Sequence, residues 1–119
     1  MVIKPKKIYD LKQRTFLFAK NVIKYVDKLP RSVSGIEIGR QLIRSAGSIG
    51  ANYIEADESL SGKDFIMRIK ICKKEAKESQ YWLLLSEPRT EDQRLKTQLI
   101  DESTQLVKIF VTIIKNSVA

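Results

Sequence analysis

The stretch that decides the fold is Arg44–Ala56, RSAGSIGANYIEA, in which an apolar and a polar stripe alternate at helical spacing. The apolar stripe advances in steps of three and four residues and consists of Leu42, Ala46, Ile49, Tyr53, Ala56 and Leu60. A neighbouring stripe has the same spacing and is polar throughout: Glu37, Gln41, Arg44, Ser48, Asn52, Glu55 and Ser59. A helix lying alone on a surface needs no such ordered polar stripe. The stretch therefore predicts a helix that packs among other helices.

Length and composition limit the classes of protein to consider. The 119 residues suit one domain with a single hydrophobic core, and only 5 Gly and 3 Pro argue against an all-β fold with many turns. No apolar run approaches the roughly 20 residues that span a bilayer. The basic N-terminus is not followed by the apolar core of a signal peptide. We therefore expect a cytoplasmic protein that does not bind membranes.

Amphipathic segments and start signals predict four helices, at about residues 10–28, 35–59, 62–86 and 91–116. They would form a single domain over residues 1–119, with a short basic N-terminal arm at Lys4–Lys7. Caps are expected at Asp10, in a capping box at Ser34–Glu37, at Ser61 and in a capping box at Thr90–Gln93. Because short links make consecutive helices antiparallel, the predicted fold class is all-α, an antiparallel up-down-up-down four-helix bundle.

Each of the other predicted helices has an apolar line for the core. In the first helix the line is Leu11, Phe18, Val22, Tyr25 and Leu29, widened by Phe16, Ala19, Ile23 and Val26. In the third it is Phe65, Ile69, Cys72, Ala76, Ser79 and Leu83, and in the fourth Leu95, Leu99, Leu106, Phe110 and Ile113. The fourth helix has a second apolar line, which predicts either deep burial or contact with another subunit: Ile100, Val107, Val111, Ile114 and Val118.

Polar residues of the second and third helices are expected to meet. Folding these helices together about residue 61 sets Arg44 against Glu75 and Glu78. It also sets Glu55 against Arg68. We interpret the contacts as a structural inter-helix network that fixes the register, formed by Arg44, Ser48, Asn52, Glu55, Arg68, Glu75 and Glu78. The alternative is a carboxylate pair for metal or acid–base chemistry.

Catalytic chemistry has few groups to use. The chain has one cysteine, Cys72, and no His, which excludes Ser-His-Asp and Cys-His arrangements and an internal disulfide. Di-metal bundles need Glu-x-x-His pairs, which this chain lacks. We therefore predict a protein that is not an enzyme and has no catalytic residue, metal or cofactor. Cys72 is interpreted as a small core residue.

Basic residues outnumber acidic ones by 22 to 14, for a net charge of +8. The excess lies in residues 1–30 and 62–86. Such a balance suits nucleic acid, although it also favours solubility. Two rows of lysines, on the first and third helices, are predicted to bind phosphates: Lys20, Lys24, Lys28, Lys70, Lys73, Lys74 and Lys77.

Small residues and aromatic residues offer two further interpretations. Gly47 and Gly50 fall inside a predicted helix, where a glycine costs about 1 kcal/mol. Their expected use is the close approach of another helix, within the subunit or across an interface. Tyr81 and Trp82 could stack on bases, but Trp82 shares a stripe with Leu85, which favours packing.

These stretches resemble a known family. Leu42–Ala56 is similar to the second-helix signature of small bacterial four-helix bundle proteins encoded within intervening sequences of large-subunit ribosomal RNA genes. The third-helix signature of this family is similar to Asp64-Phe65, Ile69-Lys70 and Lys74–Leu83 of the chain. The start of the family pattern is similar to Asp10-Leu11 and Arg14-Thr15-Phe16. More distantly, the chain resembles the accessory variability protein of diversity-generating retroelements. Glu55-Ala56 stands where many members have Glu-Gly.

The resemblance implies a homopentamer, a ring of four-helix bundles around a central channel. For the retroelement branch, the resemblance also implies binding of nucleic acid and of a reverse transcriptase through a basic surface. We therefore expect a non-enzymatic, oligomeric, basic bundle that binds structured RNA, in preference to DNA, through phosphates. The alternative is a protein–protein scaffold, or an accessory factor for a partner enzyme such as a reverse transcriptase.

Overall fold

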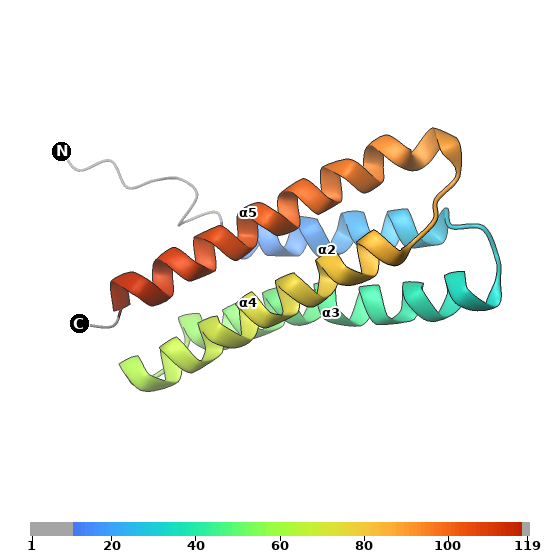
Figure 1. Ribbon diagram of the computed structural model, residues 1–119. Helices are drawn as coiled ribbons and strands as arrows, with labels where there is room; N and C mark the ends of the chain where they lie inside the picture. The colour runs from blue at the N-terminus through green and yellow to red at the C-terminus, as the bar shows by residue number, and fades with distance from the viewer. Residues whose placement is uncertain (1–10, 118–119) are drawn as a thin grey trace.

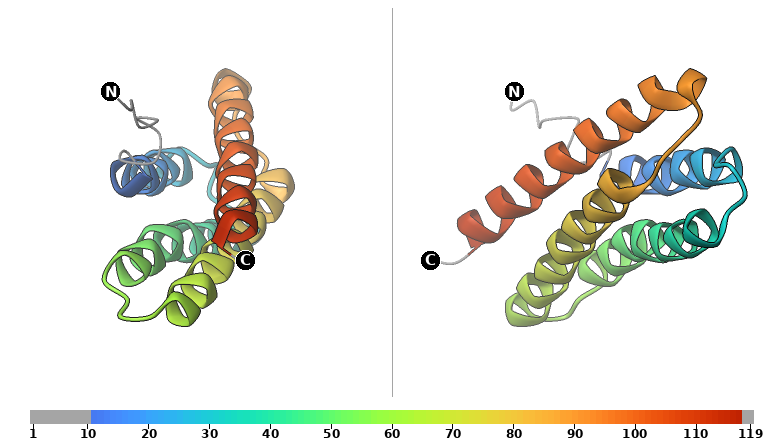
Figure 2. Two further views of the ribbon diagram at one scale, coloured as in Figure 1. Left: turned by 90° about the vertical axis from the view of Figure 1, so that its left-hand side faces the viewer. Right: turned by 45° about the vertical axis from the view of Figure 1, so that its right-hand side comes forward.

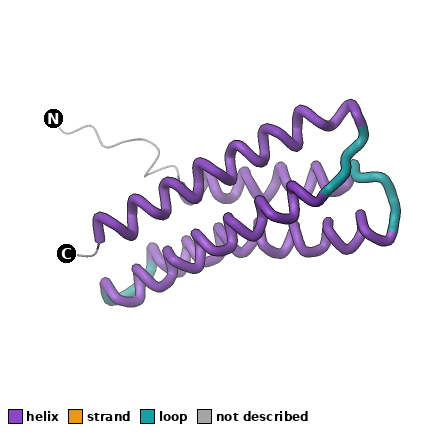
Figure 3. The backbone as a smooth tube through the Cα atoms, viewed as in Figure 1, coloured by secondary structure: helices purple, strands orange, loops and turns teal. Residues whose placement is uncertain are grey.

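Residues 11–117 are described by a computed structural model in which four long helices follow one another along the chain (Figure 1). The helices are α2 (Leu11–Asp27), α3 (Val33–Asp57), α4 (Gly62–Leu85) and α5 (Gln93–Ser117), with a 3-10 turn, η1 (Thr90–Asp92), directly before α5. The described residues consist of helices and loops alone (Figure 3), so the predicted all-α fold class is confirmed. The predicted arm at Lys4–Lys7, the cap at Asp10 and the apolar Val118 lie outside the described residues.

Successive helices run in opposite directions and form an up-down-up-down bundle (Figure 1). α3 packs between α2 and α4, and α4 packs between α3 and α5. α5 touches α2 over a much shorter stretch and is inclined to it (Figure 2). The bundle is therefore closed tightly along α3 and α4 and loosely along its α2/α5 edge. No helix within residues 11–117 is both long and apolar enough to cross a membrane.

The predicted apolar lines form one core. Its fully buried large side chains come from all four helices and include Phe18, Tyr25, Leu42, Ile49, Ile69, Leu83, Leu106 and Phe110. One predicted core residue of the α3 line is wrong, because Leu60 is 101% exposed. α3 ends at Asp57, so Leu60 belongs to the loop and does not continue the apolar stripe of the helix.

The core-facing side of α2 is narrower than predicted. Phe16 and Ile23 are 63% and 44% exposed, so they do not widen the core. The reason is the position of α3, which lies against Thr15 and Val26 of α2. At these two points Gly50 and Gly39 of α3 bring the helices close together. Phe16 and Ile23 lie beyond this contact line and face outward.

The helix starts differ in part from the predicted caps. Ser61 caps α4 as predicted, because its hydroxyl accepts a hydrogen bond from the Asp64 amide at 3.1 Å. α3 begins earlier than expected: Ser32 is its cap, and its hydroxyl accepts from the Gly35 amide at 2.9 Å. The predicted box at Ser34–Glu37 is therefore wrong. The box predicted at Thr90–Gln93 is replaced by the 3-10 turn, whose cap residue Arg89 makes no side-chain capping bond.

One ion pair connects α2 to α5, and the sequence did not indicate it. The Arg14 guanidinium donates to both carboxylate oxygens of Glu102, at 2.7 and 2.9 Å, and to the side-chain amide oxygen of Gln105 at 3.2 Å. The hydrogen bond to Glu102 raises the pKa of Arg14. This bidentate contact clamps the loosely packed edge of the bundle.

Candidate nucleic-acid interface

The seam between α3 and α4 brings together several residues of the predicted network. Arg44 donates to Glu78 at 2.9 Å across the outer side of the seam. Directly after these two residues in the chain, the buried hydroxyls of Ser45 and Ser79 lie 2.9 Å apart. Each helix is thereby held at one register, because sliding by a turn would separate both pairs. The contact between Arg44 and Glu78 agrees with the structural role between helices that the polar stripe predicted.

The partner of Arg68 differs from the prediction. Arg68 donates to the side-chain oxygen of Asn52 at 3.2 Å, and the Asn52 amide nitrogen donates to the carbonyl and hydroxyl of Ser48 at 2.9 and 3.0 Å. Glu55 is exposed and has no ion-pair partner among residues 11–117. The predicted Glu55–Arg68 contact is wrong because Asn52, one turn nearer along α3, occupies the position opposite the guanidinium.

Glu75 is buried, being only 8% exposed, and does not meet Arg44. Its Oε1 atom has no hydrogen-bond partner in the described part of the chain. The same is true of Arg68 Nε and Trp82 Nε1. The three residues are spaced by seven along α4 and lie on its α3 side. A polar group that stays buried without a hydrogen-bond partner costs about 1–3 kcal/mol.

The two carboxylates of the seam, Glu75 and Glu78, lie in different surroundings. Glu78 is engaged by the Arg44 guanidinium, which leaves Glu75 as the single unpaired carboxylate of the predicted pair. Within residues 11–117 no three or more His, Cys, Asp or Glu side chains are grouped as a metal site requires. The geometry therefore favours the structural interpretation of these residues over the carboxylate-pair alternative.

Cys72 lies in the core, where its thiol donates to the Ile49 carbonyl at 3.4 Å. Burial raises the pKa of Cys72 to about 12. Because an unfolded thiol has a pKa of about 8.5, this group favours folding fully below that pH. Its contribution is then lost as the pH rises toward the folded value. We expect a thiol-specific reagent such as DTNB at pH 8.5 to label the native protein about 100-fold more slowly than the urea-unfolded chain.

The measurement is the rate of thionitrobenzoate release in native buffer and in urea. Tyr25 and Tyr53, whose pKa values burial also raises, should lower stability over a similar alkaline range. A Cys72→Ala variant therefore separates the thiol's share of the pH dependence. Rapid labelling of the native protein would contradict the buried position of Cys72.

The lysines predicted to bind phosphates form two separate rows. Lys20, Lys24 and Lys28 are exposed along and just after α2, whereas Lys70, Lys74 and Lys77 are exposed along α4. α2 and α4 occupy diagonal corners of the bundle (Figure 2), so the rows do not form one surface within a subunit. None of the six lysines forms an ion pair within residues 11–117.

Lys73 differs from the other α4 lysines because it is half-buried. The exposed α4 row continues into Tyr81, which is four residues after Lys77 and 56% exposed. Trp82 is half-buried against the core and meets the Tyr81 ring edge-on at 5.0 Å. Of the two aromatic residues considered for base stacking, only Tyr81 presents its ring to solvent. The predicted packing role of Trp82 agrees with its position.

The family model of the 23S rRNA-intervening sequence protein matches residues 7–111. The chain belongs to this family. A solved structure from Bacteroides thetaiotaomicron, described as a protein of unknown function from the S23 ribosomal protein family, is 31% identical, with a TM-score of 0.75. The likeness covers 87% of this chain and 97% of the other.

No match was found among curated proteins. The name of the family refers to intervening sequences of ribosomal RNA. Neither the family description nor the description of the solved structure names an activity. The more distant likeness to the retroelement accessory protein remains a prediction.

Proposed function

We propose that this protein binds structured RNA through phosphate contacts made by the exposed lysine row of α4, Lys70, Lys74 and Lys77. The observation that carries the proposal is that all three ammonium groups are exposed on one side of a helix without a carboxylate partner in the described residues. Adjacent lysines on one helix face repel one another. Phosphates between them would remove that repulsion and release condensed counterions.

The α4 row is favoured over the α2 row because of its aromatic neighbour. Tyr81 extends the α4 row with an exposed ring on which an unpaired base can stack. The aromatic residue next to the α2 row, Phe16, already lies under the Lys20 ammonium, which is 5.9 Å from the ring centroid. RNA is favoured over DNA because folded RNA presents the loops and bulges whose bases can stack on such a ring.

The test is fluorescence anisotropy with a labelled RNA hairpin taken from large-subunit ribosomal RNA, titrated with the protein at 50 to 300 mM salt. Three phosphate contacts predict that log K falls against log salt with a slope of roughly −2 to −3. A triple variant, Lys70→Glu, Lys74→Glu and Lys77→Glu, should weaken binding at least about tenfold at low salt. A DNA hairpin of the same sequence should bind less tightly.

The matched control is the triple variant Lys20→Glu, Lys24→Glu and Lys28→Glu, which changes the net charge by the same amount on the other row. Circular dichroism should show that both variants remain helical. Equal losses of RNA affinity in the two variants would mean that binding depends on net charge and not on the α4 row. The proposal fails if the wild-type protein shows no RNA binding at 50 mM salt, or binding that salt does not change.

A further inference from the structure

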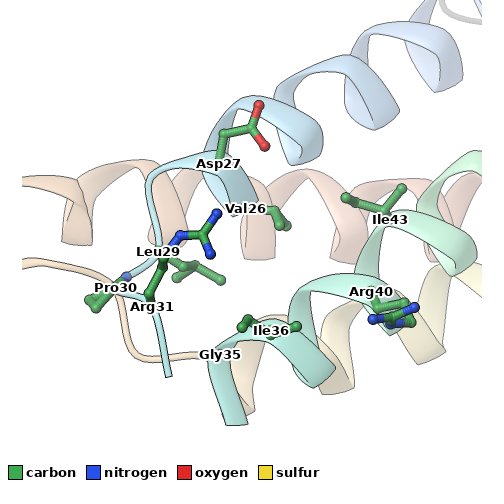
Figure 4. A pocket seen from close by; sticks show the side chains of 9 residues that line it. All are labelled: Val26, Asp27, Leu29, Pro30, Arg31, Gly35, Ile36, Arg40 and Ile43. Atoms are coloured by element: carbon green, nitrogen blue, oxygen red, sulfur yellow. The ribbon is translucent and has the colours of Figure 1, made fainter. Parts of the chain in front are cut away.

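A hollow of about 430 Å³, the Arg31/Arg40 hollow, lies where the end of α2 and the loop after it meet the first half of α3. Its apolar walls include Val26, Leu29, Pro30, Ile36 and Ile43. Three charged side chains also line it, those of Asp27, Arg31 and Arg40. Figure 4 shows the two arginines on opposite sides of the hollow, with Ile36 between them and Asp27 at the top of the view. Small-molecule sites commonly combine apolar walls with a few polar groups in this way.

Two glycines of α3 fix the shape of this part of the bundle. A Cβ atom at Gly35 would lie 2.8 Å from the Pro30 carbonyl oxygen and 2.9 Å from Ser32 Oγ, so the loop sits directly on the first turns of α3. A Cβ atom at Gly39 would lie 2.7 Å from Val26 Cγ1. The loop and α2 are therefore both held close to α3, and the hollow between them is formed without a ligand.

The charged side chains of the hollow have no strong partner. Neither Asp27 nor Arg31 forms an ion pair within residues 11–117. Arg40 Nε lies 3.7 Å from Glu37 Oε1, and these two side chains are 72% and 65% exposed. An exposed ion pair of this kind contributes at most about 1 kcal/mol. Both guanidinium groups are therefore available to an anion.

The balance of charge distinguishes this hollow from two others. The hollow between the α2–α3 and α4–α5 loops is lined by three basic and three acidic residues, so its charges cancel. The hollow at the α2/α5 edge contains the Arg14–Glu102 pair, whose members neutralise each other. The Arg31/Arg40 hollow instead has two guanidinium groups, one carboxylate and apolar walls. It suits a ligand that has an anionic group, a flat apolar part and donors for a carboxylate.

A guanine nucleotide has these three properties. A guanidinium group binds a phosphate through paired N–H donors, and its flat face can also stack on a base. The Watson–Crick edge of guanine has two adjacent N–H donor groups, which match the two acceptor oxygens of a carboxylate. The same edge of adenine, cytosine or uracil has a single donor group. The carboxylate of Asp27 therefore favours guanine over the other bases.

We propose that the Arg31/Arg40 hollow binds a guanine nucleotide. The phosphate lies on Arg40, the base lies against Ile36 and the Arg31 guanidinium, and the Watson–Crick edge of the base donates to Asp27. A free nucleotide and an unpaired guanosine in an RNA chain share this chemistry. The proposal does not rest on RNA binding by the α4 row, because none of the three α4 lysines lines the hollow.

The test is an NMR titration of ¹⁵N-labelled protein with guanosine 5′-monophosphate (GMP), read at the five glycine amides. Gly35 lines the hollow and Gly39 packs beside it on Val26, so both signals should shift and saturate. The expected Kd is about 0.1–1 mM. Gly47 and Gly62 lie outside the hollow and should keep their positions. Adenosine 5′-monophosphate (AMP) should bind at least about fivefold more weakly, because it lacks one of the donors for Asp27.

Each proposed contact has its own variant. Asp27→Asn should remove the preference for GMP over AMP, because an amide has one acceptor oxygen. Arg40→Gln should weaken GMP binding at least about fivefold. It should leave the binding of guanosine, which has no phosphate, unchanged. The matched control is Arg94→Gln, because Arg94 is an exposed arginine outside the hollow. This variant should bind GMP like the wild-type protein.

A pentanucleotide of uridines with one central guanosine identifies the source of the nucleotide. If it shifts Gly35 and Gly39 at concentrations similar to GMP, the hollow binds a guanosine within RNA. If GMP alone shifts them, the ligand is the free nucleotide. The proposal is overturned if GMP at about 5 mM moves neither signal. It is also overturned if inorganic phosphate shifts both signals at the same concentration as GMP, or if AMP binds as tightly.

The proposed RNA binding is tested separately from the nucleotide site. The triple variant Lys70→Glu, Lys74→Glu and Lys77→Glu should still bind GMP. Arg40→Gln should still bind the ribosomal RNA hairpin in a salt-dependent way. Failure of RNA binding with intact GMP binding would leave the nucleotide site standing, and the reverse result would leave the proposed function standing.

Discussion

Phe110→Ala is expected to lower the free energy of unfolding by about 3–5 kcal/mol. Phe110 is among the largest fully buried side chains, with 0% exposure, and lies in the core line of α5. Its truncation removes apolar surface from the core and leaves a cavity that the surrounding helices cannot fill completely. α5 is attached mainly to α4, so the loss should act directly on the docking of this helix.

Urea unfolding followed by circular dichroism measures the change. Thr112→Ala is the matched control, because Thr112 is exposed on the same helix and its truncation should change the stability by less than about 0.5 kcal/mol. A loss below about 1 kcal/mol for Phe110→Ala would mean that α5 is not docked through this side chain. A loss near the predicted size, with the m-value unchanged, supports the packing described above.

Gly39→Leu is the second substitution with a large expected effect. A Cβ atom at position 39 would lie only 2.7 Å from Val26 Cγ1, and Val26 is a stiff, β-branched side chain. A leucine here must push α2 away from α3, at a cost of about 1–3 kcal/mol or more. This cost exceeds the roughly 1 kcal/mol that a better helix former contributes in place of glycine.

Gly47→Ala is the control for helix propensity, because position 47 has no neighbouring atom within 4 Å. It should stabilise the protein by about 1 kcal/mol. A double-mutant cycle of Gly39→Ala with Val26→Ala then isolates the contact. The destabilisation by Gly39→Ala should shrink or vanish when Val26 is already truncated. If Gly39→Ala stabilises the protein as much as Gly47→Ala does, the close approach of α2 and α3 at this point is wrong.

The sequence predicted the parts of the fold that follow from helical periodicity. Positions such as Leu42, Ile49 and Phe110 are buried because residues three and four apart share one helix face, whatever the partner helix is. The Arg44–Glu78 pair was also predicted, since a short turn between two helices fixes which residues face each other. Helix ends were harder to predict because several Ser and Thr residues near each start can cap, and the structure selects one.

The sites were less predictable because they depend on the angles between helices. Periodicity placed Phe16 and Ile23 with the core, yet the close α2/α3 contact at the glycines leaves both outside it. Periodicity likewise showed two lysine rows but not that they lie on diagonal corners of the bundle. No local pattern indicated the Arg14–Glu102 clamp, since its two residues are 88 positions apart and their meeting depends on the tilt of α5.

The contrast between the α3/α4 seam and the α2/α5 edge has a consequence for folding order. α3 and α4 are joined by a short loop and matched at several polar and apolar positions, so they form a hairpin of local contacts that can assemble early. We expect α5 to gain its contact with α2 late, because the Arg14–Glu102 contact closes most of the chain into a loop. Breaking the Arg14–Glu102 contact would separate α5 from α2 and leave the α3/α4 hairpin in place. We therefore expect the α2/α5 edge to open at a lower free energy than the α3/α4 hairpin.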